Sequence, residues 1–333
     1  MASKKVTIKD VAKAAGVSIS TVSNAINNVD VLHPDTKQHI LEVAESLDYI
    51  PNLTGRNLKA QATNVIGLFI NSMKGPYYSM LADSIYWACK KYGYELNIFI
   101  SDKAENMMAN ILGKRVDGAV ILNEYIEDRQ VKMLSDNEIP TVFIDREKKG
   151  KYISSVVFDS YHEGELAARY LLELGHKTFI YMKGVEHNYD NIERQRGFQT
   201  ILKQAGISLP EECMLEGLFE REAAYNSMRD FLETGKELPD AIFAANDVSA
   251  IGTIEALLEE GVRVPEQVSV MGCDDVETAQ LVSPSITTIR TSFEKQGTLA
   301  VEHLVGLIKG ETGGSIEILN GRIIPRESTR MRE

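Results

Sequence analysis

Apolar residues near the N-terminus repeat with the spacing of a short helix. The residues at i, i+3, i+4 and i+7 that would form its buried face are Ile8, Val11, Ala12 and Ala15. Thr7 and Asp10 form a capping-box-like start, and Gly16 is a typical residue for the position after the last turn. The pattern therefore predicts a short helix over residues 8–15.

A second apolar stripe follows this helix closely. Its members are Ile19, Val22, Ala25 and Ile26. Ser18 can cap the second helix and Asn27-Asn28 would stop it, while a third helix begins at Pro34 and runs to Leu47. Two short helices joined by a glycine-containing turn, with a third helix behind them, are typical of a helix-turn-helix domain.

Beyond residue 64, short apolar runs alternate with helical patterns. The runs that predict strands are 65–70, 95–100, 117–122, 140–144, 155–158, 178–182, 240–244 and 268–272. The helical patterns between them include 77–91, 160–174, 190–205, 221–234 and 247–260. Such alternation is typical of parallel sheets with helices on both faces. We therefore expect a small all-α head and an α/β body of two doubly wound parallel-sheet lobes.

Composition restricts the class of protein. Of the 333 residues, 44% are hydrophobic and 25% are charged, which is ordinary for a globular chain. No apolar run is long enough to span a membrane or resembles a signal peptide, so we expect a cytoplasmic protein with no membrane partner. Cys89, Cys213 and Cys273 are far apart and odd in number, which argues against a disulfide framework or a zinc site. We expect no metal and no cofactor.

The net charge of −12 is unevenly distributed along the chain. Residues 1–63 contain seven Lys or Arg and six Asp or Glu, so this segment carries +1 and the remaining residues carry −13. A near-neutral head on an acidic body is compatible with a polyanionic partner for the head alone. Simple variation of charge along the chain would explain the asymmetry equally well.

The second predicted helix has an uncharged hydrogen-bonding face opposite its apolar stripe. Ser20 and Asn24 point away from the stripe, and Thr21 and Ser23 flank them. A helix in the DNA major groove needs such groups, because Asn can pair with the N6/N7 edge of adenine and Ser can donate or accept. A small helical subdomain with a solvated polar face would show the same pattern, so both interpretations stay open here.

Polar residues follow the carboxyl ends of the predicted strands, where open α/β sheets bind ligands. They are Asn71-Ser72, Ser101, Asn123, Asp145-Arg146, Asn246-Asp247 and Asp274-Asp275. The aromatic residues that could stack on a ring are Tyr77, Tyr78, Phe158 and Phe219. This inventory favours a sugar, whose vicinal hydroxyls suit paired Asp, Asn and Arg, but it also suits a nucleobase. Any one of the Asp or Asn residues could instead cap the helix that follows it.

Longer strings add a resemblance to a known family. VTIKDVAKAAGVSISTVSNAINN, LDYIPN and GRNLK resemble the N-terminal signature of the lactose/galactose-repressor (LacI/GalR) family. RQRGF, ANDVSAIG, VPEQVSVMGCDD and PSITTIRTSF are similar to its effector-binding domain, so the resemblance covers essentially the whole chain. It implies a type I periplasmic-binding-protein-like body and a transcriptional repressor. Many relatives have Arg where Asn24 stands, which implies a different base preference.

The resemblance also implies domain boundaries. It predicts a helix-turn-helix domain over 1–50, a hinge helix over 51–63 and an effector-binding domain over 64–333. The N-lobe would comprise about 64–159 and 291–319, and the C-lobe about 160–290 and 320–333. In the family the hinge folds on operator DNA, and its leucine, here Leu58, enters the minor groove with Arg56 and Lys59 near phosphates.

Two sets of site residues follow. Those expected to bind DNA are Thr7, Ser18, Ile19, Ser20, Thr21, Ser23, Asn24, Asn27, Asn52, Arg56, Leu58 and Lys59. Those expected to bind an effector are Tyr77, Tyr78, Asn123, Asp145, Phe158, Arg194, Phe219, Asn246, Asp274 and Phe293. Within the second set, Arg194, Asn246 and Asp274 match the family's sugar-hydroxyl binders.

The expected partners are double-stranded, pseudopalindromic operator DNA, a small-molecule effector such as a sugar, and a second copy of the chain. A homodimer is expected because the residues up to Glu333 show no heptad pattern for a tetramer-forming bundle. A protein corepressor, which some relatives use, is an alternative regulator of DNA binding. A sugar- or nucleobase-binding protein without operator readout, a solute-binding protein for a transporter, and an enzyme are the remaining alternatives. We expect no enzyme, because the sequence contains no GxSxG, HExxH, GxGxxG or Walker-type motif.

Overall fold

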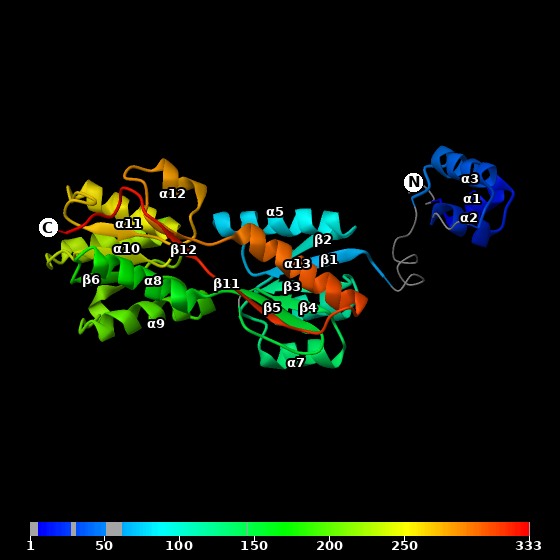
Figure 1. Ribbon diagram of the computed structural model, residues 1–333. Coiled ribbons are helices and arrows are strands. Elements are labelled where there is room, and N and C mark those ends of the chain that lie inside the picture. The colour runs from blue at the N-terminus through cyan, green and yellow to red at the C-terminus, as the bar shows by residue number, and fades with distance from the viewer. Residues whose placement is uncertain (1–5, 28–30, 51–61, 145, 333) are drawn as a thin grey trace. The chain divides into compact units, whose positions relative to one another are not determined.

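The computed structural model describes residues 6–27, 31–50, 62–144 and 146–332. The chain divides into two compact units, Met1–Thr63 and Asn64–Glu333 (Figure 1). Within the described ranges, no helix is both long and apolar enough to cross a membrane.

The N-terminal unit contains the three predicted helices, α1 (Ile8–Ala15), α2 (Ile19–Ile26) and α3 (Pro34–Ser46). The Asp10 carboxylate accepts hydrogen bonds from the backbone N–H and the hydroxyl of Thr7 at 2.9 and 2.7 Å. Gly16 ends α1 in the left-handed region with a φ of +67°. The Ser18 hydroxyl accepts from the N–H of Thr21 at 3.1 Å and caps α2. These contacts confirm the predicted start and end of the first helix and the predicted start of the second.

A small apolar core joins the three helices, and Val11, Val22 and Ile40 are fully buried in it. The prediction that Ile19 belongs to the buried stripe is wrong, because 46% of this residue is exposed. Ile19 is the first residue of α2, and helical side chains lean toward the N-terminus, so it extends past the edge of the packed helices.

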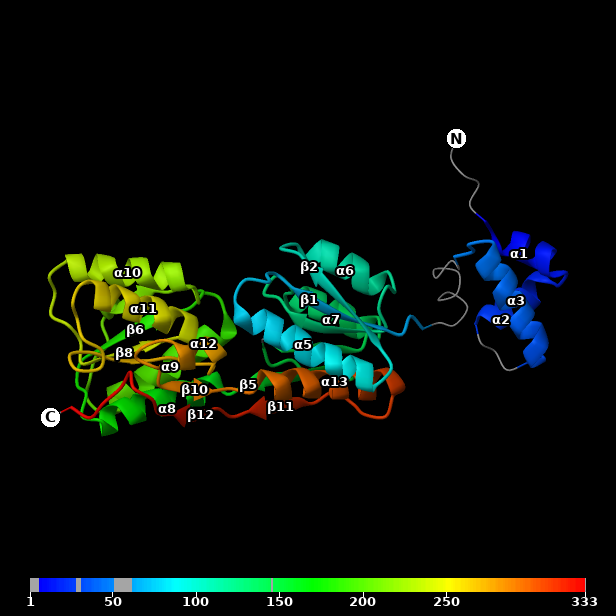
Figure 2. The same ribbon diagram turned by 90° about the horizontal axis from the view of Figure 1, so that it is seen from above.

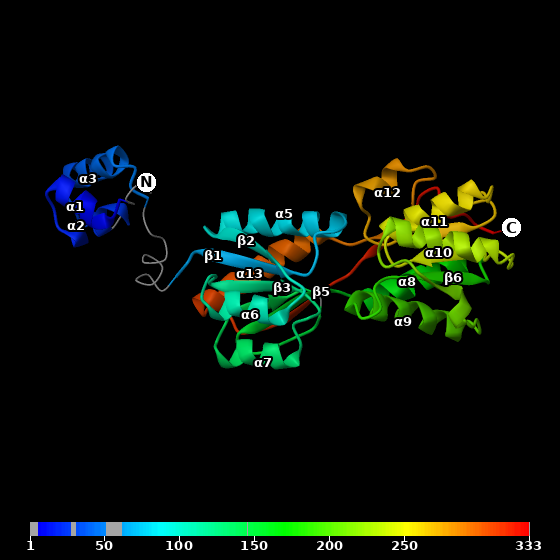
Figure 3. The ribbon, with the colours of Figure 1, turned by 180° about the vertical axis from the view of Figure 1, so that it is seen from behind.

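The first sheet of the second unit is wholly parallel. Its strands are β1 (Val65–Ile70), β2 (Glu95–Ile100), β3 (Gly118–Leu122), β4 (Thr141–Phe143), β5 (Ile153–Phe158) and β11 (Ile316–Leu319). They lie in the order β11-β5-β4-β3-β1-β2, so β2 is an edge strand. One face is covered by α5 (Pro76–Lys91) and α13 (Phe293–Lys309), which pack side by side (Figure 2). The other face is covered by α6 (Ala104–Leu112) and α7 (Asp128–Asp136) (Figure 3).

The second sheet is also parallel, in the order β7-β6-β8-β9. Its strands are β6 (Phe179–Lys183), β7 (Met214–Glu216), β8 (Ala241–Ala244) and β9 (Ser269–Met271). The helices around it are α8 (Ser160–Glu173), α9 (Tyr189–Gln204), α10 (Arg221–Glu233), α11 (Asp247–Glu259) and the short α12 (Glu277–Leu281). The pairs α8–α9 and α10–α11 lie on opposite faces of the sheet (Figure 1).

The chain passes between the two sheets three times. It crosses between β5 and α8, between β10 (Thr288–Arg290) and α13, and between β11 and β12 (Arg322–Ile324). β10 pairs with β12 in an antiparallel ribbon beside the second sheet. Each lobe is therefore built from segments that are distant in sequence.

The helices expected over 160–174, 190–205, 221–234 and 247–260 are confirmed to within one residue at either end. Most of the elements that the apolar pattern did not indicate are short, and α13, with 17 residues, is the exception. These elements are α6, α7, α12, α13, β7, β10, β11 and β12. In α7 only Leu134 is buried, and β7 has no fully buried residue, so few buried apolar residues mark these segments in the sequence.

The contact between α8 and α9 in the C-lobe depends on two glycines. A Cβ at Gly164 of α8 would lie 2.0 Å from the carbonyl oxygen of Arg194, and a Cβ at Gly197 of α9 would lie 1.9 Å from that of Tyr161. The absence of side chains at both positions lets the backbones of α8 and α9 approach each other.

We expect Gly197→Ala to separate α8 from α9 and to lower the free energy of unfolding by roughly 1–3 kcal/mol, the usual cost of overpacking. Urea denaturation measures the loss. Gly313→Ala is the matched control, because a Cβ there meets no atom within 4 Å. Equal midpoints for the two variants would show that this contact does not limit the fold.

Candidate functional site

The polar face of α2 projects from the helical core. Ser20 is exposed and Asn24 is partly exposed. The hydroxyl oxygen of Ser18 lies 2.7 Å from the hydroxyl oxygens of both Ser20 and Thr21, which links the first turn of the helix. Within the part of the chain that the structure describes, no hydrogen bond engages the amide of Asn24. Its donor and its acceptor are therefore both available to a base edge.

Other members of the expected DNA-binding set are engaged locally. The Thr7 hydroxyl donates to Asp10, and the Asn27 amide donates to the Ser23 hydroxyl at 3.2 Å. Exposed Ile19 adds an apolar group beside the polar face. The expected hinge residues lie outside the described residues; they are Asn52, Arg56, Leu58 and Lys59.

Arg194, on α9, lies at the centre of the expected effector site and is only 3% exposed. Its Nε and Nη2 donate to one carboxylate oxygen of Glu163 at 3.2 and 2.7 Å, and its Nη1 donates to the Ala245 carbonyl at 2.8 Å. Burial alone would lower the pKa of Arg194, but Cys273 and Glu163 raise it well above its usual value. The guanidinium therefore stays charged, and one N–H of Nη1 has no hydrogen-bond partner among the described residues.

Asn246 and Asp274 follow β8 and β9 and approach the same region of the C-lobe. Asn246 caps α11, because its Oδ1 accepts from the Ser249 N–H at 2.9 Å; its Nδ2 donates to the Phe219 carbonyl at 3.3 Å. The capping alternative is thus confirmed for Asn246. Asp274 has a φ of +115°, and burial raises the pKa of its carboxyl well above its usual value, against the opposing charge of Arg194.

Phe219 occupies a backbone position that side chains seldom adopt. Leu218 and Phe219 have φ values of +53° and +60°, both in the left-handed region. The Phe219 ring lies against Gly184 at the end of β6, where a Cβ would come within 2.2 Å of the ring. Gly184 is fixed in turn, because its N–H donates to the buried Asn191 side chain at 2.7 Å. The ring is thus fixed in one place at this edge of the C-lobe.

The aromatic residues of the N-lobe form one cluster. The ring of Phe293 lies 4.9 Å from that of Tyr77 and 5.7 Å from that of Phe158, measured between centroids, and Tyr77 lies 5.6 Å from Tyr78. Phe158 and Phe293 are 5% and 4% exposed, so they form the floor of the cluster rather than an open face. The structure therefore brings together the four aromatic residues expected from the N-lobe.

Asn123 is almost fully buried and connects neighbouring loops. Its Nδ2 donates to the Ser101 carbonyl, and its Oδ1 accepts from the Tyr125 N–H, both at 3.0 Å. These bonds fix the carboxyl ends of β2 and β3. Asp145, the remaining member of the expected set, lies outside the described residues.

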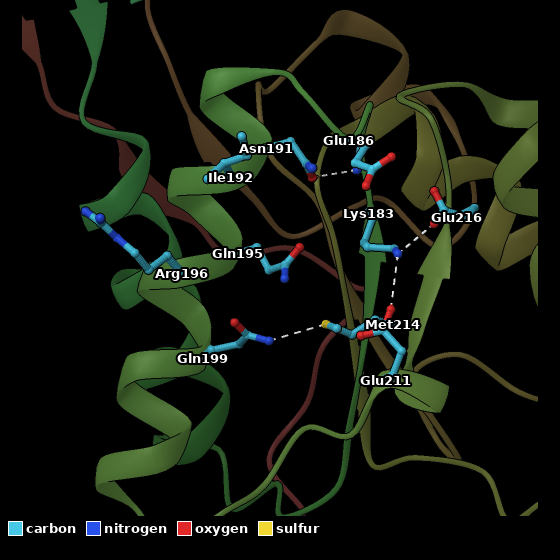
Figure 4. Close-up of a pocket in the computed structure, with 11 residues that line it drawn as sticks. Lys183, Glu186, Asn191, Ile192, Gln195, Arg196, Gln199, Glu211, Met214 and Glu216 are labelled. Carbon is cyan, nitrogen blue, oxygen red and sulfur yellow. Dashed lines mark hydrogen bonds and ion pairs between the residues drawn. The ribbon is translucent and has the colours of Figure 1, made fainter. Parts of the chain in front are cut away.

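One cavity of about 420 Å³ lies in the C-lobe between α9 and the strands β6 and β7 (Figure 4). The Lys183 ammonium is 2.6 Å from Glu216 and 3.6 Å from Glu211, and the side chain of Gln195 points toward the same space. The residues that line this cavity include none of the expected effector set.

A second cavity, also of about 420 Å³, is lined by residues of both lobes. We call it the inter-lobe cavity. Phe158 is the one expected effector residue in its lining, beside the polar and aromatic side chains of Glu147, Tyr161, Tyr189 and Glu193. Sequence reasoning did not find these four residues, because loop and helix-start positions carry no period that marks a cavity.

Glu163 was also missed as a site residue, although the sequence contains a signal for it. It occupies the buried stripe of α8 together with Gly164, Ala167 and Leu171, and it is 0% exposed. A carboxylate in an apolar stripe needs a cation as a partner. That requirement points to a buried Arg or Lys elsewhere in the chain, which is Arg194.

Comparison with known proteins agrees with this architecture. Residues 7–52 match the model of the bacterial regulatory proteins of the lacI family, and residues 168–329 match that of a periplasmic binding protein-like domain. The HTH-type transcriptional repressor PurR of Photorhabdus laumondii subsp. laumondii is 36% identical over 330 residues, which cover 97% of this chain and 96% of that protein. PurR of Haemophilus influenzae (strain PittEE) is 35% identical over 315 residues, with 92% and 93% covered.

Two solved structures of regulators share the fold. The lac repressor dimer bound to operator and the anti-inducer ONPF is 26% identical, with a TM-score of 0.83 and coverage of 98% of this chain and 100% of that chain. The complex of the transcriptional regulator CelR with cellobiose is 27% identical, with a TM-score of 0.74 and coverage of 97% and 100%. The expected fold class, a small helical head and an α/β parallel-sheet body, is confirmed.

Asp247 gives the C-lobe a pH-dependent stability. This fully buried carboxylate accepts from the Thr288 hydroxyl at 2.6 Å and from the Val276 N–H at 3.0 Å, but burial outweighs these bonds and raises its pKa from the ordinary 3.8 to about 7. Between about pH 4 and pH 7 the folded protein therefore binds a proton that the unfolded chain has released. Its contribution to stability is present below that window and is lost as the pH rises through about 7.

We expect Asp247→Asn to remove this pH dependence, because the amide can accept from Val276 and donate to the Thr288 hydroxyl. The slope removed approaches about 1.4 kcal/mol per pH unit within the window. Urea denaturation at several pH values between about 4.5 and about 8 measures the change in slope. Asp136→Asn, at an exposed carboxylate of α7, is the control that should keep the wild-type slope. A wild-type slope in Asp247→Asn would contradict this assignment.

Proposed function

Because the chain belongs to the lacI family of bacterial regulatory proteins and is a DNA-binding transcriptional repressor, we propose that it binds a pseudopalindromic operator as a homodimer and that a small molecule between its lobes controls this binding. Because its relatives are transcriptional repressors, catalysis is excluded as the main function of the chain. The related lac repressor structure contains a dimer bound to operator DNA. The two-fold symmetry of a dimer requires a two-fold-symmetric DNA site.

The exposed face of α2 is the observation that supports direct operator readout. Ser20 and Asn24 offer uncharged hydrogen-bonding groups on the side of the helix away from buried Val22. No charged residue lies within α2, so base edges would meet neutral donors and acceptors there. Lys9 and Lys13 on α1 supply positive charge for phosphates.

Exposed apolar side chains in the body support the homodimer. Trp87 of α5 and Ile100 of β2 are each 57% exposed, and β2 is an edge strand of its sheet. In the C-lobe, Leu281 of α12 is 75% exposed. α5 and α12 lie along the same side of the body (Figure 1). A patch of this kind over both lobes suits an isologous interface with a second copy of the chain.

The proposed effector is a small polyhydroxylated molecule that meets Arg194 and Asp274. Arg194 retains a donor and Asp274 an acceptor, a pair that suits vicinal hydroxyls, and the rings of Phe219 and Tyr77 would suit the apolar face of a sugar. The CelR complex, at 27% identity, contains cellobiose, which supports a sugar; a nucleobase is the alternative effector. An effector that contacts both lobes would favour one arrangement of the lobes, which the three chain crossings connect. The coupling free energy between effector binding and DNA binding is typically about 1–3 kcal/mol.

We expect Asn24→Ala to relax base preference at one position of each half-site. Loss of a bidentate amide–adenine pair should reduce discrimination there by about 1–3 kcal/mol, while binding to the phosphate backbone changes little. Competition binding with single-base variants of the operator, at fixed salt, measures the loss. Gln38→Ala, an exposed amide of α3 bonded to Glu42, is the control. Unchanged preference in Asn24→Ala would exclude this face of α2 as the reader.

We expect Trp87→Lys to raise the dissociation constant of the dimer at least about tenfold, because it places a charge in an apolar interface. Light scattering during size-exclusion chromatography over a dilution series measures the change. Met133→Lys, at a half-exposed apolar residue of α7 on the opposite side of the body, should remain dimeric. If the wild-type chain is monomeric at all concentrations, or if both variants remain dimeric, the proposed interface is wrong.

A further inference from the structure

The inter-lobe cavity has a lining unlike that of the effector site. Glu147 and Ile318 come from the N-lobe, whereas Tyr161, Tyr189 and Glu193 come from the C-lobe. Arg194, Asn246 and Asp274 do not line it, so it is a separate space beside the crossing from β5 to α8. Its volume of about 420 Å³ is within the usual range for small-molecule sites.

Carboxylates dominate the charge of this cavity. Glu147, Asp159 and Glu193 line it, against one cation, Arg196. Arg196 is already paired with Glu193 at 2.5 Å, and its guanidinium lies 4.8 Å from the centre of the Tyr161 ring. Among the described residues that line the cavity, this pairing leaves two carboxylates without a cation.

Neutral groups alone satisfy those two carboxylates. Glu147 accepts a hydrogen bond from the Tyr189 hydroxyl at 3.1 Å, and Asp159 accepts from the His162 N–H at 3.0 Å. In the part of the chain that the structure describes, no Lys or Arg pairs with either one. Each carboxylate retains acceptor capacity toward a ligand.

Aromatic rings form the remaining walls. Phe158, Tyr161 and Tyr189 line the cavity together with these carboxylates. Ring faces attract cations, and the attraction grows when the cation is removed from water. A space with aromatic walls and an excess of negative charge therefore selects a positively charged guest over a neutral one of the same size.

We propose that the inter-lobe cavity binds a small organic cation with primary ammonium groups. One ammonium lies between Glu147 and Asp159, and the aliphatic part packs against Tyr161 and Tyr189. Because Glu147 belongs to the N-lobe and Tyr189 to the C-lobe, the guest adds to the hydrogen bond that already joins these two residues across the lobes. An amine at this site would therefore stabilise the present arrangement of the lobes independently of a ligand at Arg194.

Calorimetric titration of the full chain with 1,4-diaminobutane tests the proposal, with 1,4-butanediol as an uncharged probe of similar length and with ionic strength held constant. We expect binding of the diamine and none of the diol. The paired variant Glu147→Gln/Asp159→Asn should weaken diamine binding at least about tenfold, since it removes both carboxylates that face the ammonium, while the new amide at position 159 could still cap α8 as Asp159 does. Glu105→Gln/Glu173→Gln removes the same charge from exposed sites outside the cavity, one in each lobe, and should bind as the wild type does.

The variant Tyr189→Phe distinguishes the contribution of the aromatic ring from that of the hydroxyl. It should retain diamine binding, because the aromatic wall remains and Glu147 loses only a neutral donor. Thermal unfolding with and without the diamine should show stabilisation of the wild type and of this variant. The proposal is overturned if the diamine does not bind, if the diol binds equally well, or if the two double variants bind the diamine alike. Loss of operator binding would bear on the proposed function and would leave these results unaffected.

Discussion

The buried charge of Arg194 is the constraint on which the C-lobe depends. A guanidinium that is 3% exposed must be paired, and removal of one partner from a buried pair costs several kcal/mol. Glu163 supplies the partner from α8, and the carbonyl after β8 supplies a further acceptor. These bonds require α8, α9 and the sheet to lie at fixed distances. Gly164 and Gly197 permit that approach, because no side chain separates the two helices.

Helix α9 contributes residues both to the expected effector site and to the inter-lobe cavity. On α9, Arg194 points inward toward the ends of β6 and β8, whereas Arg196, two residues later, lines the inter-lobe cavity. A small shift of α9 would therefore alter both spaces together. The three crossings of the chain would transmit such a shift to the N-lobe. The proposed dimer contacts along α5 would then carry it to the second copy. Coupling of this kind requires that the ligand bind one arrangement of the lobes better than the other.

Much of the fold could be predicted from the sequence, because its helices are strongly patterned and well capped. Thr7, Gly16 and Ser18 mark helix ends that the structure confirms. The prediction that Ile19 is buried was wrong, because periodicity does not reveal where a packed surface stops. Parallel-sheet topology also indicated that Asn123, Asn246 and Asp274 follow strand ends. Their hydrogen bonds were not predictable: Asn246 caps a helix and Asn123 connects two loops, which depends on distances between segments remote in sequence. The inter-lobe cavity was not predictable for the same reason, since Glu147 and Tyr189 meet only after both lobes have formed.

The central claim is that one chain reads operator DNA and that a small molecule in its body controls this reading. The most direct measurement is selection from random-sequence DNA duplexes by the purified chain, at one stated salt concentration, with and without a mixture of sugars. Salt must be fixed because phosphate contacts make affinity depend on it. The account predicts enrichment of a two-fold-symmetric sequence whose recovery changes with the mixture. If no sequence is enriched under any condition, or if the enriched site is asymmetric and indifferent to every sugar, the account is contradicted.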